Sequence, residues 1–222
     1  MIGENAAGTP RRGFLGRIAA AAVGLGAASL MPTPAEAEAG PAHPAADPKL
    51  EAWFGKLTGK HKTVFDAPEP NNGMPAIWPR VYLNSTDATY PGEPAVAMII
   101  LRHAGLGMAF QDSIWAKYPI SEMFNIKPEG KAITANPYGT ITALPIPGLG
   151  IAELLKSGAL VGACDVALSM YSAGAAGKMG MDAAAVKKEW IAGLFPGIQV
   201  VPSGVMAAAR AQEFGANYIF AG

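Results

Sequence analysis

The sequence contains a single cysteine, Cys164, and no surplus of charge of either sign. One cysteine excludes an internal disulfide and any zinc site built on clustered cysteines. Lys plus Arg and Asp plus Glu number 17 each, so no excess of cations is available for a phosphate backbone, and we expect no nucleic acid partner. The ten methionines are scattered and form no copper-binding cluster. We predict no metal site and no cofactor.

Linear catalytic motifs are also lacking. The chain has no Gly-x-Ser-x-Gly elbow, no phosphate loop and no His-Glu-x-x-His, which are the short patterns that most often reveal hydrolases, nucleotide-binding enzymes and metalloproteases. The step Gly105-Leu-Gly107 is too short to define a dinucleotide site. The residues alone leave open whether the protein is an enzyme, and a hydrolase or oxidoreductase is the least favoured class.

Residues 1–39 have the pattern of a twin-arginine export signal. Arg11 and Arg12 are followed one residue later by Phe14-Leu15, and the apolar run 18–31 spans 14 residues. Because a bilayer span needs ~20 residues, we expect no membrane span after signal removal. Two small-x-small triplets, 35–37 and 37–39, offer cleavage sites. An uncleaved amphipathic anchor is the alternative, but the run has no amphipathic charge pattern. We expect a periplasmic protein.

The remaining residues predict one α/β domain. Half of the 222 residues are apolar and 15% are charged, a balance typical of a compact core. Residues 40–49 form a Pro/Ala linker, and the domain is expected over 50–222. Apolar or β-prone runs predict five strands, at 62–66, 95–101, 159–164, 198–201 and 217–220. Helical patterns separate them, at about 77–83, at 150–158, after Asp182 and after Ser203. This alternation predicts a mostly parallel five-stranded sheet with helices on both faces.

One segment, 119–149, does not fit the alternation. It contains five prolines and three glycines and has no convincing period. An irregular stretch of this length tends to be a lid, a binding loop or an oligomer contact, although a surface decoration is the simpler alternative. Its apolar residues Ile141, Leu144, Ile146 and Leu149 favour a function slightly, because they are unsuited to free solvent.

Polar residues follow several of the predicted strands. In open parallel sheets, ligands bind outside the carboxyl ends of the strands. The candidate site residues at those ends are Asp66, Arg102, His103, Cys164, Asp165 and Ser203. We expect these residues to meet along one edge of the sheet. Asp66 has a turn cap as its alternative role, Arg102 an ordinary surface charge, and His103 a structural histidine instead of an acid–base group.

Of these residues, Cys164 has the side chain with the widest range of possible chemistry. A thiol at a strand end that faces a helix start can be held as thiolate by backbone N–H groups and by a cation such as Arg102 or His103. The alternative is a small buried hydrophobe in the run Leu-Val-Gly-Ala-Cys. The neighbouring Asp165 disfavours the thiolate, because like charges repel.

Three segments in the second half resemble the DsrE family, and in particular its exported, twin-arginine-signal members. They are 158–168, 194–205 with Val-Val-Pro-Ser-Gly-Val, and 211–219 with Ala-Gln-x-x-Gly-x-x-Tyr-Ile. The resemblance covers about residues 60–220, with 119–149 as an interruption. It implies a three-layer α/β/α domain, homo-oligomers and, for better understood members, sulfur relay through a cysteine that matches Cys164. Those sulfur carriers work in the cytoplasm, and Asp165 is atypical beside a relay thiol.

Two hypotheses follow. In the first, the protein binds or relays sulfane sulfur as a persulfide on Cys164, with Arg102 and His103 supporting the thiolate, and it meets a sulfur donor or acceptor protein. In the second, the protein is a non-enzymatic binding or oligomeric module, Cys164 is inert core, and the insertion 119–149 makes the ligand or subunit contact.

Overall fold

The computed structural model describes residues 47–222. The expected signal peptide and residues 40–46 of the expected linker lie outside the described residues. The described part begins with helix α2 (Pro48–Phe54), which the side chain of Asp47 caps by accepting the N–H of Lys49. None of the helices between residues 47 and 222 combines the length and apolar character that crossing a membrane requires.

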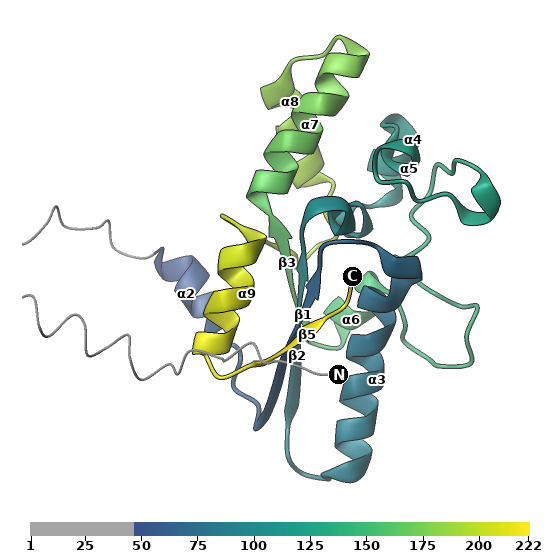
Figure 1. Ribbon diagram of the computed structural model, residues 1–222. Helices are drawn as coiled ribbons and strands as arrows, with labels where there is room; N and C mark the ends of the chain where they lie inside the picture. Colours follow the sequence, from purple (N-terminus) through teal and green to yellow (C-terminus); the bar gives the residue numbers. More distant parts are fainter. Residues whose placement is uncertain (1–46) are drawn as a thin grey trace, which may run out of the picture. The chain divides into compact units, whose positions relative to one another are not determined.

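A five-stranded sheet forms the centre of the domain, and all its strands are parallel (Figure 1). Its order is β4-β3-β2-β1-β5. The strands, in chain order, are β1 (His61–Ala67), β2 (Ala95–Leu101), β3 (Leu160–Cys164), β4 (Gln199–Val201) and β5 (Asn217–Phe220). The predicted fold class is therefore confirmed, with every strand within two residues of its expected position.

The sheet is buried on both faces because its central strands are apolar throughout. In β2, Met98 and Ile100 belong to the core on one face, whereas Ile99 and Leu101 belong to the core on the other. Helices α2 and α9 (Gly204–Glu213) cover the first face. The second face is covered by the helices α3 (Met74–Thr89), α6 (Ile151–Lys156), α7 (Asp165–Met179) and α8 (Ala183–Ala192) and by the 3-10 helix η3 (His103–Ala109).

Helix α7 follows β3 directly, and the sequence analysis does not anticipate it. Its exposed glycines, Gly174 and Gly177, and its many alanines give it little difference between an apolar and a polar face, so the period that reveals amphipathic helices is weak. The helix ends at Gly180, whose φ of +64° is left-handed. As a result, Cys164 lies between a strand and a long helix.

The irregular segment 119–149 is attached to the domain by apolar packing as well as by polar and backbone contacts. Its buried apolar side chains are Leu149 and three that belong to the core on the α7 face, Ile120, Phe124 and Ile126. It contains only the short helix α5 (Ile120–Met123) and the 3-10 turn η4 (Pro128–Gly130), and it follows α4 (Asp112–Lys117). The side chain of Asn136 donates to the carbonyls of Met108 and Phe110. Ile141 and Leu149 form an antiparallel bridge that closes the end of the segment. Leu144 is exposed.

Gly105 fixes the path of η3 beside β1. A Cβ at this position would lie 2.2 Å from the carbonyl oxygen of Ala67. We therefore expect Gly105→Ala to lower the free energy of unfolding by about 1–3 kcal/mol, because backbone must shift to admit the methyl group. Gly174→Ala is the control: a Cβ there meets nothing within 4 Å, and the helix should gain roughly 0.5–1 kcal/mol. Urea unfolding of both variants measures the difference, and equal stabilities would contradict the assigned contact.

Candidate functional site

The strand register brings the carboxyl ends of the strands to one edge of the sheet. Ala67 of β1 lies beside Leu101 of β2, and Leu101 lies beside Ala163 of β3. Arg102 directly follows β2, and Cys164 is the last residue of β3. Each comes one residue after the Leu101–Ala163 pair, so the two residues are level with each other. Asp66, one step back on β1, pairs with Phe220 of β5.

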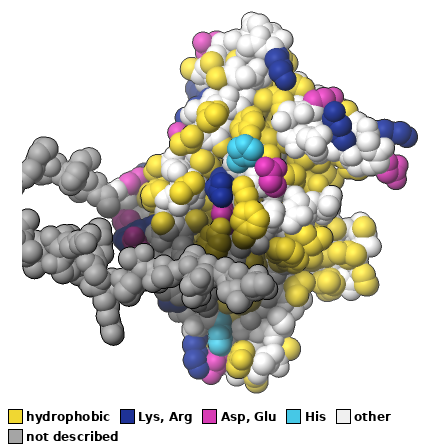
Figure 2. Space-filling view, viewed as in Figure 1, with side chains coloured by type: hydrophobic (Ala, Val, Ile, Leu, Met, Phe, Trp, Pro, Cys, Tyr) yellow, Lys and Arg dark blue, Asp and Glu magenta, His cyan; other side chains and the backbone are white. Residues whose placement is uncertain are grey.

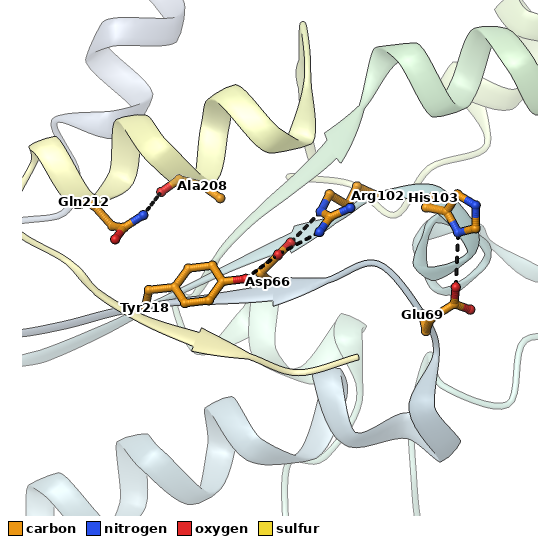
Figure 3. Close-up of polar contacts among 7 residues, drawn as sticks. All are labelled: Asp66, Glu69, Arg102, His103, Ala208, Gln212 and Tyr218. Carbon is orange, nitrogen blue, oxygen red and sulfur yellow. Dashed lines mark hydrogen bonds and ion pairs between the residues drawn. The ribbon is translucent and has the colours of Figure 1, made fainter. Parts of the chain in front are cut away.

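Asp66 and Arg102 form a bidentate ion pair at this edge (Figure 3). The Nε of Arg102 donates to one carboxylate oxygen at 2.7 Å, and its Nη2 donates to the other at 2.9 Å. The Asp66 side chain is 4% exposed and that of Arg102 is 26% exposed. The carboxylate thus depends on its partners for solvation, whereas the guanidinium still reaches water.

Tyr218 completes this cluster, and the sequence analysis does not single it out. Its hydroxyl donates to the Asp66 carboxylate at 2.6 Å (Figure 3). Burial, together with the hydrogen bond to Asp66, raises the pKa of Tyr218 to about 12. Tyr218 lies on β5, the last strand of the chain and the neighbour of the first. Only the strand order, which the sequence does not display, could have revealed the contact.

The start of α9 packs directly against the side chain of Arg102. A Cβ on Gly204 would lie 2.6 Å from the Cβ of Arg102, so the helix approaches this closely only with glycine. Ser203 occupies the cap position of α9, but its side chain makes no capping hydrogen bond. The hydrogen bond to Asp66 raises the pKa of Arg102, with smaller contributions in the same direction from Tyr218 and Cys164.

Cys164 is the cap residue of α7. Its Sγ accepts the N–H of Ala167 at 3.5 Å, so the sulfur lies at the positive end of a 15-residue helix. The residue is 6% exposed and belongs to the core cluster on the α7 face. Cys164 therefore combines the polar contact expected of a reactive thiol with the low exposure expected of a structural one.

Asp165, the next residue, has a cationic partner on the neighbouring helix. Its carboxylate forms an ion pair with Lys187 of α8, at 2.7 Å. The charge that disfavours a thiolate at Cys164 is therefore paired with a cation.

His103 has an exposed imidazole that points toward Glu69. Its imidazole is 62% exposed, and its Nδ1 is 3.2 Å from a carboxylate oxygen of Glu69 (Figure 3). The ring meets Tyr171 edge to face. Its backbone φ of +47° is left-handed, a strained conformation that tends to occur at functional sites. The structure thus groups Asp66 with Arg102 and directs His103 toward Glu69.

A cavity of about 620 Å³ begins at Glu69. Asn71 and Asn72 line it from the loop after β1, and residues 124–129 line it together with Tyr138 from the irregular segment. The segment therefore forms one wall of a hollow beside His103. Within residues 47–222, no group of three or more His, Cys, Asp or Glu side chains is arranged to hold a metal ion.

No family model matches the chain, and no curated protein matches it significantly.

The two halves of the ion pair should respond unequally to substitution. Arg102→Leu leaves the buried Asp66 carboxylate with Tyr218 as its remaining side-chain partner, and should cost about 3–5 kcal/mol of unfolding free energy. Asp66→Asn leaves a guanidinium that water can reach, and should cost less. Urea unfolding of the two variants tests the order, which would be refuted by an equal or larger loss in Asp66→Asn.

The Tyr218 hydrogen bond should make stability depend on pH in the alkaline range. The folded-state pKa is raised from the ordinary 10.0 to about 12, so the stabilisation is complete below pH 10 and is lost as the pH rises from 10 to 12. Wild type should exceed Tyr218→Phe in thermal stability at neutral pH, and the difference should shrink across this window. A difference that stays constant up to pH 12 would contradict the assigned bond.

Proposed function

We propose that this is an exported DsrE-like protein that binds or relays sulfane sulfur as a persulfide on Cys164, in the periplasm. The observation that carries the proposal is the position of the sulfur, at the start of α7 and within the electrostatic reach of Arg102. Helix N–H groups and a nearby cation both favour a thiolate, which is the nucleophilic form of cysteine. The sequence resemblance supports the same residue.

The proposed chemistry needs no external oxidant or reductant. The Cys164 thiolate attacks the outer sulfur of a polysulfide or of thiosulfate. A new S–S bond forms, the old S–S bond breaks, and its electron pair leaves with the shorter polysulfide or with sulfite. In the return step, the thiolate of an acceptor protein attacks the outer sulfur of the persulfide, and Cys164 leaves as thiolate.

The other site residues have supporting roles in this proposal. Arg102, held by Asp66, contributes positive charge toward Cys164. His103 and Glu69 stand at the rim, where a polar sulfur donor or an acceptor protein would arrive. Ser203 directly precedes the helix that packs on Arg102. Because Asp165 is paired with Lys187, its charge opposes the thiolate less than the sequence alone suggests.

The second candidate function is a non-enzymatic binding or oligomeric module with an inert Cys164. It is favoured by the 6% exposure of Cys164 and by its membership of the core. In that case, the irregular segment and the cavity beside Glu69 would make the ligand contact.

Mass spectrometry after incubation with polysulfide or thiosulfate tests the sulfur proposal. Wild type should gain ~32 Da, the mass of one sulfur atom added as a persulfide, which a thiol reductant should remove. Because the chain has one cysteine, the adduct should vanish in Cys164→Ala. Arg102→Gln should form it more slowly at neutral pH, since the thiolate loses a neighbouring cation. Asp165→Asn, matched in size and adjacent, should not slow the reaction.

Thiol titration of the native protein separates the two candidate functions. A Cys164 that reacts with a thiol reagent in the folded protein supports sulfur transfer. Absence of any adduct at any pH, with reaction only after denaturation, would remove the sulfur proposal and leave the binding module.

A further inference from the structure

The strand β5 is an edge of the sheet with apolar, exposed side chains. Its other side pairs with β1, and no strand of the described residues pairs with its free side. Tyr218 is 44% exposed, Ile219 38% and Phe220 53%. Hydrophobic side chains occupy the middle of the face in Figure 2, where Figure 1 shows β5. β5 contains no charged residue, no proline and no bulge, which are the usual devices that keep an edge strand single.

The opposite edge of the same sheet is protected. β4 is partly buried and is followed at once by Pro202. The side chain of Gln199 donates to the carbonyl of Val200 within the strand. The domain therefore shields one edge and leaves the other open, which points to a use for β5.

The hydrogen-bonding groups of β5 have a defined direction. The N–H of Ala221 donates to the carbonyl of Asp66, so the odd-numbered residues of this stretch direct their backbone groups toward β1. Because these directions alternate along a strand, Tyr218 and Phe220 direct theirs outward. Each of these two residues thus has both its N–H and its C=O group pointing outward, with one residue between them. An antiparallel neighbouring strand requires this pattern.

We infer that β5 pairs with β5 of a second copy of this chain, in an antiparallel arrangement about a two-fold axis at Ile219. In an antiparallel pair of identical strands related by a two-fold axis, opposite residues have their side chains on the same face of the sheet. The numbers of any two opposite residues therefore add up to the same even number. With Ile219 opposite itself, Tyr218 lies opposite the partner's Phe220 on both sides of the axis. The outward N–H and C=O groups of these two residues then satisfy one another. Aromatic cross-strand pairs of this kind stabilise sheets.

The flanking helices extend the contact on both faces. A stable interface covers ~800 Å² of each partner, more than four edge residues supply. Ile219 lies beside Phe65, which contacts Tyr82 of α3, and α3 also exposes Trp78 and Val81. On the other face, α9 packs against β5 and exposes Val205 and Met206. A second copy of this chain presents the same apolar edge with its hydrogen-bonding groups in the matching register, and it is therefore the partner that we assign to β5.

Charge variants at the axis test this dimer. In sedimentation or light-scattering measurements over a concentration series, wild type should have twice the mass of one chain. Ile219→Lys and Ile219→Asp should each weaken the dimer at least about tenfold, because like charges then face each other. An equimolar mixture of the two variants should restore it. Met170→Lys, at a 69% exposed position on α7, is the matched control and should leave the mass unchanged.

Amide hydrogen exchange of the wild type gives a readout that does not depend on any variant. The N–H groups of Tyr218 and Phe220 should be protected at high protein concentration and lose protection on dilution. A wild type that is monomeric throughout the series, or a dimer that both Ile219 variants leave intact, would overturn the inference. Neither result bears on the sulfur chemistry of Cys164, which the persulfide measurement decides separately.

Discussion

The buried carboxylate of Asp66 is the constraint on which the carboxyl edge of the sheet depends. A carboxylate removed from water is tolerated only when charged or hydrogen-bonding partners replace its solvation. Those partners come from both neighbouring strands, Arg102 after β2 and Tyr218 on β5. Keeping them in contact fixes the relative position of three strands. It also explains why α9 begins with Gly204, since a larger residue would displace Arg102.

The ion pair with Asp66 limits how Arg102 can act on Cys164. The Nε and Nη2 of Arg102 donate to Asp66, and the hydrogen bond to the sulfur comes from Ala167, so Arg102 acts on Cys164 through its charge and not through a direct hydrogen bond. The principal polar contact of the sulfur is the N–H of Ala167. Stabilisation of a thiolate at Cys164 therefore depends mainly on helix α7. Because the residue has low exposure, the access of a reagent to the sulfur, more than the nearby charge, distinguishes a sulfur carrier from an inert core residue.

The sequence predicted the parts of the molecule that local pattern controls. The apolar run 95–101 has the pattern of a buried strand, and parallel topology then placed Asp66 and Arg102 at one edge. Tyr218 was beyond prediction, because its contact depends on β5 lying next to β1. The orientation of His103 toward Glu69 arises from a left-handed backbone that no residue pattern announces. Helix α7 escaped detection because Ala and Gly carry almost no amphipathic signal.

The strand β5 connects the edge of the sheet to the site. Tyr218 extends its hydroxyl to the buried Asp66, while much of its ring remains exposed. Covering that ring with the partner's Phe220 would exclude water from the hydrogen bond to Asp66. Electrostatic interactions strengthen when water is excluded, because the effective dielectric constant falls. Pairing of two copies would thus tighten the same carboxylate cluster that holds Arg102 beside the thiol, so that assembly and site chemistry share one side chain.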